Sequence, residues 1–326
     1  MNKLYPLKFK PIFKERIWGG TKIRTRLGLD FAPLTYCGEA WIISGVPGSE
    51  TKVANGFLKG NTLNELVEIY MDDLLGEKPF ERNQKMFPLL IKFIDANDWL
   101  SIQVHPDDAL AAKRGIGGGK TEMWYVLGAE KDAELISGFS KKVDSDTYVK
   151  YLDGKRLPEI LNFEKVKEGD VFYIPSGRVH ALGPGILLAE IQQTSDTTYR
   201  IYDWDRVDAE GKSRQLHTDL ALAAIDFKVY DNYRTRYTPK QNMTSKLVDC
   251  PWFITNLLSF DKEIRKDYTD LDSYVIYIIT EGSALLRWDS GSENLIAGEA
   301  ILVPALIRNL TIKPSPACKL LEIYEP

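Results

Sequence analysis

Four residues of this chain have the types and spacing of a metal site. The chain contains three histidines, and two of them, His105 and His180, fall on predicted strands beside turn residues. Gln103 lies two residues before His105, so a strand would turn both side chains to one face, and Glu122 begins a later predicted strand. Because neighbouring strands lie about 4.8 Å apart, ligands from adjacent strands can converge on one ion. Two imidazoles, one carboxylate and one amide oxygen suit Zn²⁺ with a position open to water or substrate, although Fe²⁺, Mn²⁺ or Co²⁺ would also fit.

Residues 168–180, EGDVFYIPSGRVH, predict the frame that holds one of these histidines. A Gly-Asp turn opens the segment, an apolar strand follows, and a Pro-Ser-Gly turn stands shortly before His180. A histidine that follows such a turn is held by a rigid backbone, so its imidazole can be aimed. The spacing of Gly169, Pro175, Gly177 and His180 resembles the second signature of the cupin β-barrels, in which the histidine is a metal ligand.

The other histidine ends residues 87–105, a segment that indicates two strands about an Asp-Ala-Asn-Asp turn. Over its last six residues, LSIQVH, apolar and polar residues alternate, and period two puts Ser101, Gln103 and His105 on one face. An interior face with these side chains costs free energy unless a polar group or an ion lies against it. The alternation therefore favours a functional site on the polar face.

The bulk composition indicates a globular protein of one large or two ordinary domains, with 326 residues and 44% hydrophobic content. A formal net charge of −4 argues against a general nucleic-acid binder. The three cysteines, Cys37, Cys250 and Cys318, are far apart and odd in number, which suits a reducing compartment. Because neither a signal-peptide pattern nor an apolar run of about 18 residues occurs, we expect a cytoplasmic protein without a membrane partner. The expected oligomeric state is a monomer or a homodimer.

The order of predicted elements indicates a mainly β chain. Residues 62–75 are expected to form a helix with a capping box, in which Thr62 and Glu65 bond each other's backbone N–H groups. The composition turns polar near residues 230–245, and strand follows strand after it. We therefore expect residues 1–238 to form a metal-binding catalytic domain with helical segments, and residues 239–326 to form a second β domain.

An internal repeat supports this division. Residues 169–176, GDVFYIPS, align with residues 298–305, GEAILVPA, and a shorter echo joins residues 123–127 to residues 275–279. On the first alignment the histidine of the first unit falls opposite Asn309. The C-terminal part is therefore predicted to be a second barrel of the same type without the metal ligands, the alternative being chance similarity between two hairpins.

Four blocks carry a wider resemblance: IKFIDANDWLSIQVHPDD, GKTEMW, IPSGRVHALGPG and LAEIQQTSDTTYRIYDWDR. From about Pro11 to Arg206 the chain resembles type I mannose-6-phosphate isomerases, in particular their short bacterial form. The resemblance implies two cupin-type (jelly-roll) β-barrels, one Zn²⁺ per chain, and interconversion of mannose 6-phosphate and fructose 6-phosphate. It places on the family's metal ligands and active-site arginine the residues Gln103, His105, Glu122, His180 and Arg200.

Aldose–ketose isomerisation moves a proton between C1 and C2 through an enediol, so it needs a base, a group that stabilises the oxyanion and a grip on the phosphate. Arg200 is predicted either to stabilise the enediolate or to hold the phosphate, since it cannot do both directly. Lys120, on the same strand face as Glu122, is predicted to move protons or bind a sugar oxygen. Glu190 or Asp196 would be the base. Glu190 is preferred because burial within an apolar strand should raise its pKa, which leaves Asp196 as a substrate contact.

The predicted phosphate contacts are Arg200, Arg206 and Ser101, since a guanidinium matches phosphate with paired hydrogen bonds. The alternative for the two arginines is surface ion pairing with Asp203, Asp205 and Asp208. Longer members of the resembled family carry a histidine where this chain has Gly119, so a proton-transfer scheme that needs that histidine would not apply here.

Two other functions use the same residues. A cupin oxygenase would place Fe²⁺ in the metal site, although the cluster of Lys120, Arg200 and Arg206 suits an anionic sugar better than an oxygen pocket. A regulator would bind a sugar phosphate without converting it. Elemental analysis with an oxygen-uptake assay distinguishes the first from an isomerase, and exchange of the substrate C2 proton distinguishes the second.

Overall fold

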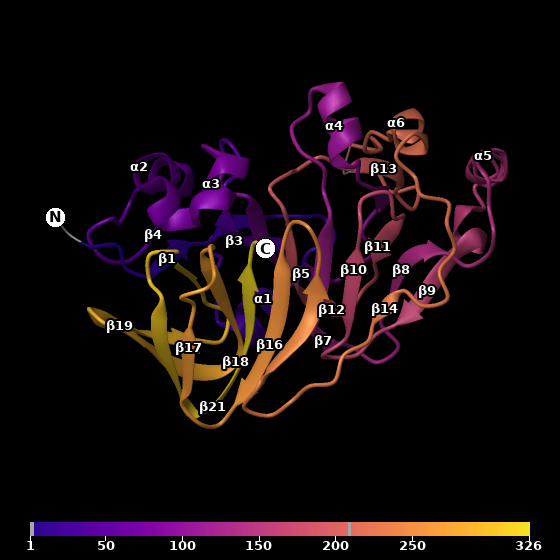
Figure 1. Cartoon of the computed structure of the whole chain (residues 1–326). Helices are drawn as coiled ribbons and strands as arrows, with labels where there is room; N and C mark the ends of the chain where they lie inside the picture. The colour runs from indigo at the N-terminus through magenta and orange to yellow at the C-terminus, as the bar shows by residue number, and fades with distance from the viewer. Residues whose placement is uncertain (1–2, 208–209) are drawn as a thin grey trace.

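The computed structural model describes residues 3–207 and 210–326 and confirms a mainly β fold. Across these residues the strands form three antiparallel sheets, which we name the central, outer and C-terminal sheets (Figure 1). Cys37, Cys250 and Cys318 are buried and free. In the described part of the chain, every helix is too short or too polar to span a membrane.

The spatial order of the strands in each sheet differs from their order along the chain. The central sheet contains, from one edge to the other, β14 (Arg234–Thr235), β10 (Val171–Ile174), β7 (Glu122–Ala129), β12 (Ile186–Gln193), β5 (Leu89–Ala96), β3 (Glu39–Ser44) and β2 (Ile12–Lys14). The outer sheet contains β13 (Tyr199–Tyr202), β6 (Ile102–Val104), β11 (His180–Leu182), β8 (Glu134–Phe139) and β9 (Leu161–Lys165). The C-terminal sheet contains β15 (Thr244–Asp249), β16 (Ile254–Phe260), β21 (Asn309–Tyr324), β18 (Val275–Trp288), β20 (Ala300–Val303), β1 (Leu7–Lys10) and β4 (Lys52–Val53), with β17 (Ile264–Asp267) beside β21 and β19 (Gly291–Ile296) beside β18.

Short helices connect these strands. They are α1 (Lys22–Leu27), α2 (Leu63–Leu75), α3 (Glu77–Asn83), α4 (Asp108–Arg114), α5 (Ser145–Asp153), the 3₁₀ helix η1 (Leu157–Ile160) and α6 (Thr218–Leu222). Helix α2 begins at the predicted capping box: the Thr62 hydroxyl accepts a hydrogen bond from the Glu65 N–H, and the Glu65 carboxylate accepts one from the Thr62 N–H. Its apolar face, which includes Leu66 and Val67, packs into the core that the central and C-terminal sheets share.

The central sheet is buried on both faces, and the period of two sorts its side chains between them. One face, which includes Met123 and Tyr125, packs against the C-terminal sheet. The other face, which includes Trp124 and Val126, packs against Leu182 and its neighbours in the outer sheet. The polar side chains that the central sheet carries on this second face therefore lie between the central and outer sheets.

The predicted alternation in residues 100–105 is confirmed on the outer sheet. Ile102 and Val104 are fully buried in a separate core under α5 and α6. Ser101 and Gln103 point the opposite way and line a cavity. The strand thus presents its polar face to the central sheet.

The internal repeat is visible in the structure. Gly169 and Gly298 both have positive φ, 85° and 87°, and each stands just before a strand, β10 or β20. β10 pairs with β7 as β20 pairs with β18, and the next strands, β11 and β21, begin at His180 and Asn309. The positions match the predicted alignment of the longer unit.

The shorter echo is shifted by one residue from the predicted alignment. Glu122 pairs with Ile174 in the first unit, and Val275 pairs with Val303 at the corresponding place in the second. Val275 therefore takes the position of Glu122 as Asn309 takes that of His180. Among the described residues, the group of acidic, histidine and cysteine side chains that could hold a metal ion comes from the first unit.

The beginning of the chain belongs to the C-terminal sheet. In β1, Leu7 pairs with Leu302 of β20, and Phe9 pairs with Val53 of β4. The expected division at residue 238 stays a prediction, but the sheet that follows it is completed by strands from the first 53 residues.

Removal of the α2 cap should destabilise the fold without touching the cavity. Thr62→Ala deletes the acceptor for the Glu65 N–H and is expected to lower the free energy of unfolding by about 1 kcal/mol. Thr62→Ser keeps the acceptor and should stay within about 0.5 kcal/mol of the wild type. Urea unfolding of both variants measures the difference, and an equal loss in the two would show that the cap does not stabilise this helix.

Candidate active site

Three side chains from two facing sheets converge on one point. His105 follows β6 of the outer sheet, His180 begins β11 beside it, and Glu122 begins β7 of the central sheet. The His105 Nε2 atom lies 3.5 Å from Glu122 Oε2, and the His180 Nε2 atom lies 3.4 Å from Glu122 Oε1. The ligand atoms of the three residues all lie within 4.8 Å of one another. The structure thus brings together three of the four predicted ligands, His105, Glu122 and His180.

Backbone carbonyls fix both imidazoles in the orientation that a metal ligand needs. The Nδ1–H of His105 donates to the carbonyl of Thr197 at 2.9 Å, and the Nδ1–H of His180 donates to that of Arg178 at 2.8 Å. Because a carbonyl can only accept, the proton of each neutral ring is on Nδ1, and the lone pair of Nε2 faces Glu122.

Burial sets the charge of this group. All three side chains are at most 1% exposed. Burial, with the nearby charge of Lys120, lowers the pKa of His105 well below its ordinary value and lowers that of His180 to about 3. Burial and the charge of Glu190 raise the pKa of Glu122 to about 7. The two imidazoles are therefore neutral at pH 7, which is the form that binds a metal.

The residues present fit a divalent metal ion. Glu122 Oε1 is buried and has no hydrogen-bond partner, which is costly for a carboxylate oxygen. The Nε2 lone pairs of both imidazoles point toward the same carboxylate, where Lys120 and Gln103 donate hydrogen bonds to them. A cation between them would satisfy the orphaned oxygen, and two nitrogens with one carboxylate are a usual ligand set for a catalytic metal.

Gln103 lies next to the same point. It pairs with His180 across β6 and β11, and its amide nitrogen donates to His180 Nε2 at 3.1 Å. The side chain therefore reaches the ligand group, but with its nitrogen rather than its oxygen turned inward. Its role as a fourth ligand stays a prediction.

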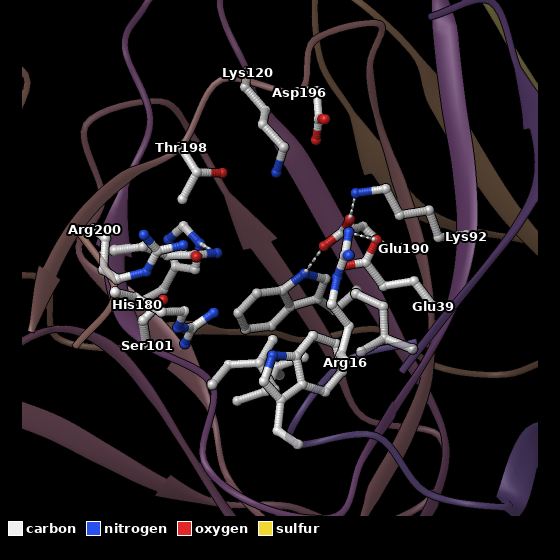
Figure 2. Close-up of a pocket in the computed structure, with 17 residues that line it drawn as sticks. Arg16, Glu39, Lys92, Ser101, Lys120, His180, Glu190, Asp196, Thr198 and Arg200 are labelled. Carbon is white, nitrogen blue, oxygen red and sulfur yellow. Dashed lines mark hydrogen bonds and ion pairs between the residues drawn. The ribbon is translucent and has the colours of Figure 1, made fainter. Parts of the chain in front are cut away.

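A cavity of about 410 Å³ opens beside this group, between the central and outer sheets. Seven of the residues singled out in the sequence line it: Ser101, Gln103, Lys120, His180, Glu190, Asp196 and Arg200. Figure 2 shows Arg200, Ser101 and His180 on one side of the cavity, and Lys92 and Glu190 on the other. The cavity is therefore lined by several cationic side chains next to the candidate metal site.

Lys120 lies between the cavity and the candidate ligands. Its ammonium donates to His105 Nε2 at 2.9 Å and forms an ion pair with Glu122 Oε2. The side chain is 4% exposed, so this contact is made almost without solvent. The predicted shared face of Lys120 and Glu122 is confirmed, and Lys120 covers the ligand group on its cavity side.

Glu190 is held differently from what the sequence suggested. Lys92, directly opposite it on β5, approaches Glu190 Oε1 at 3.0 Å, and the Trp124 indole N–H donates to Glu190 Oε2 at 2.9 Å. Burial alone would raise the pKa of Glu190, but the charges of Lys92 and Lys120 outweigh it and lower the pKa to about 2. The expectation of a raised pKa is therefore wrong, because the sequence did not reveal the lysine across the strand pair.

Sequence reasoning missed Lys92, although a signal existed. In the apolar run FPLLIKFI a single charged residue stands within a strand that is buried throughout. Glu39, Arg16 and Arg214 also line the cavity and were not singled out. They come from segments far from the recognisable blocks or from the polar stretch after Arg206, where periodicity gives no guidance.

The two predicted arginines differ: Arg200 lines the cavity, whereas Arg206 forms an ion pair with an aspartate. Arg200 lines the cavity, its Nε is buried without a partner, and its guanidinium donates to the Gln215 carbonyl at 2.8 Å. Its backbone N–H donates to His217 Nδ1 at 3.1 Å, which fixes the strand that carries it. Arg206 is outside the cavity lining and is bound by Asp203 and the Trp99 carbonyl.

The acidic residues near these arginines have different partners. Asp203 pairs with Arg206 and with Arg214, Asp205 pairs with Lys155, and Asp208 lies outside the described residues. The ion-pair alternative therefore describes Arg206, whereas Arg200 has its guanidinium at the cavity wall. The predicted phosphate contact of Arg206 has no geometric support.

The Lys92–Glu190 pair gives a stability prediction. Glu190→Ala leaves a buried lysine without its carboxylate and should lower the free energy of unfolding by about 3 to 5 kcal/mol. Lys92→Met combined with Glu190→Ala removes the unpaired charge and should recover most of that loss. Chemical unfolding of the single and double variants checks this, and a double variant no more stable than the single one would contradict it.

The same pair gives a pH dependence with a defined sign. Because the folded-state pKa of Glu190, about 2, lies below its ordinary value of 4.5, the pair stabilises the fold above pH 4.5 and this contribution is lost as pH falls toward 2. The gap in unfolding free energy between wild type and Glu190→Gln should therefore shrink across that window. A gap independent of pH would show that Glu190 is not ionised in the native state.

Comparison with known proteins places this geometry in a family. Residues 6–134 match the family described as phosphomannose isomerase type I, catalytic domain. Mannose-6-phosphate isomerase ManA of Bacillus subtilis is 42% identical over 254 residues, 76% of this chain and 77% of that protein. The mannose-6-phosphate isomerase of Streptococcus mutans is 35% identical over 305 residues, 93% of this chain and 94% of that protein.

A solved structure agrees over nearly the whole chain. The crystal structure of mannose 6-phosphate isomerase from Bacillus subtilis matches with a TM-score of 0.88 and 35% identity, over 98% of this chain and 99% of that one. The match includes the C-terminal sheet, for which the sequence blocks gave no motif. The chain belongs to the type I phosphomannose isomerase family.

Proposed function

We propose that this protein interconverts mannose 6-phosphate and fructose 6-phosphate by proton transfer through an enediol. One observation carries the proposal: the buried group of His105, Glu122 and His180 lies beside a cavity that also presents Arg200. Membership of the family supports the same reaction. When bound, a divalent metal, which we propose is Zn²⁺, supplies Lewis-acid polarisation of the sugar oxygens, and His105, Glu122 and His180 would hold it.

The phosphate group of the sugar is assigned to the Arg200 side of the cavity. The buried Nε of Arg200 has no partner, and a buried guanidinium N–H without an acceptor favours binding of an anion. Arg214 lines the same cavity, and its pairing with Asp203 fixes its position. Ser101, 4% exposed, adds a hydroxyl on the same side (Figure 2). Phosphate bound here would place the carbon chain toward the metal ligands and Lys120.

Asp196 is the carboxylate available as the base. Both oxygens of Glu190 accept hydrogen bonds, one from Lys92 and one from the Trp124 indole. Its lowered pKa also makes Glu190 a weak base. Asp196 also lines the cavity, and the described chain offers its carboxylate neither an ion pair nor a hydrogen bond. We therefore assign proton removal at the substrate carbon to Asp196, in place of the Glu190 preferred from sequence.

Lys120 is assigned to the developing oxyanion. Its ammonium stands at the boundary of cavity and ligand group, so it can donate a hydrogen bond to a substrate oxygen there. Gly119, just before it, cannot carry the histidine of the longer forms. An added Cβ at Gly119 would lie 2.6 Å from the backbone nitrogen of Asp108. This chain thus performs its proton transfers without that side chain.

The reaction and its metal dependence are tested together. The protein should convert mannose 6-phosphate to fructose 6-phosphate, lose turnover with a chelator and regain it with Zn²⁺. His180→Ala should lose both bound metal and turnover, whereas His217→Ala, a histidine outside the ligand group, should keep its metal. Incorporation of deuterium at C2 from heavy water reports the enediol. Binding of mannose 6-phosphate without conversion and without exchange of the C2 proton would favour a sugar-phosphate-binding protein. Oxygen uptake would favour an oxygenase.

The choice of base is tested by paired substitutions. Asp196→Asn keeps size and polarity but removes the proton acceptor, so kcat should fall by about 100-fold or more. Asp205→Asn, which alters an exposed aspartate paired with Lys155, is the matched control and should leave kcat unchanged. A wild-type kcat in Asp196→Asn, together with a large loss in Glu190→Gln, would return the role to Glu190.

A further inference from the structure

The segment that carries Lys120 has little packing of its own. Residues 115–119, GIGGG, contain four glycines, and an added Cβ at Gly115 or Gly117 would meet no heavy atom within 4 Å. Glycine loses more conformational entropy on ordering than any other residue. A segment of this composition needs hydrogen bonds from elsewhere to hold Lys120 at one place.

Asp108, the first residue of α4, supplies the anchor. Its Oδ1 accepts hydrogen bonds from the Gly119 N–H at 2.7 Å and from the Gln193 amide at 3.0 Å. Gln193 in turn accepts a hydrogen bond from the Thr121 N–H at 2.8 Å. The backbone is thus held immediately before and immediately after Lys120.

The third hydrogen bond to Asp108 comes from the other part of the chain. The indole N–H of Trp252, in the turn between β15 and β16 of the C-terminal sheet, donates to Asp108 Oδ2 at 3.0 Å. Asp108 is exposed. A cavity of about 320 Å³ lies alongside, lined by Trp252, Asp108, Gly118 and Gly119. The indole is thus one of three donors that orient the Asp108 carboxylate, and the one that binds its second oxygen.

We propose that Trp252 and Asp108 are positioning residues for Lys120, through which the C-terminal sheet helps to shape the active site. Trp252 orients the Asp108 carboxylate, Asp108 holds Gly119, and Gly119 sets where the Lys120 ammonium meets His105 and Glu122. The kinetic part of this inference rests on the proposed function. The structural part, a link between Trp252 and the glycine segment, stands apart from it.

Trp252→Phe tests the link, because phenylalanine keeps an aromatic ring but removes the N–H donor. Trp288→Phe is the matched control: it removes an indole hydrogen bond in the same sheet, to Ser290, at a distance from the active site. Hydrogen exchange of a peptide spanning residues 115–121 should become faster in Trp252→Phe and stay unchanged in Trp288→Phe. Unchanged exchange in Trp252→Phe would overturn the proposal, whether or not the protein is an isomerase.

Kinetics test the effect on Lys120. Trp252→Phe should lower kcat by about tenfold, as expected for a misplaced catalytic group, and leave KM within about twofold. In a Lys120→Met background the same substitution should lower residual kcat no further, since its effect passes through the lysine. Full additivity of the two losses would contradict a positioning role.

A second variant keeps the proposal testable if Trp252→Phe does not fold. Asp108→Asn can keep its carbonyl oxygen toward the Gly119 and Gln193 donors but then turns its NH2 group toward the Trp252 indole N–H, so it should reproduce both the faster exchange and the lower kcat. Thermal unfolding of each variant separates these local effects from loss of the fold. Wild-type exchange and kcat in a folded Asp108→Asn variant would refute the assignment.

Discussion

A carboxylate buried between two sheets is the constraint on which the site depends. Removing Glu122 from water costs several kcal/mol, and that cost must be offset by charge or hydrogen bonds nearby. Lys120 compensates one oxygen, while the other is left without a partner. The neutral imidazoles of His105 and His180 cannot donate to it, since their Nδ1 protons are committed to backbone carbonyls. A metal ion among these three side chains would complete the arrangement.

The C-terminal sheet shows the same problem solved without a metal. Glu322 is 2% exposed, yet Asn256 donates to one of its oxygens, and Lys266 and Tyr268 reach the other. The protein itself balances this charge, and Val275 and Asn309 occupy the places of Glu122 and His180. One structural unit thus occurs twice, once with a candidate metal site and once with a closed polar core.

The sequence predicted what local patterns determine. Alternation identified the polar face with Ser101, Gln103 and His105, and the turn before His180 identified the framed strand. The capping box identified the start of α2. The sequence alone could not show which strands pair. It therefore could not place Lys92 opposite Glu190 or predict the sign of the Glu190 pKa shift. The sequence offered both a phosphate contact and pairing with Asp203 for Arg206, and only the tertiary fold shows that Arg206 forms the ion pair outside the cavity lining.

The place of β1 has a consequence for biosynthesis. Leu7 pairs with Leu302, so β1 cannot complete its sheet until the chain as far as β20 has been made. Contacts of such long sequence separation carry a loop-closure cost and form late. Until then β1 exposes an unpaired edge, a state in which nascent chains are prone to associate with one another. The free edge of β1 thus needs either rapid synthesis of the chain as far as β20 or protection during that time.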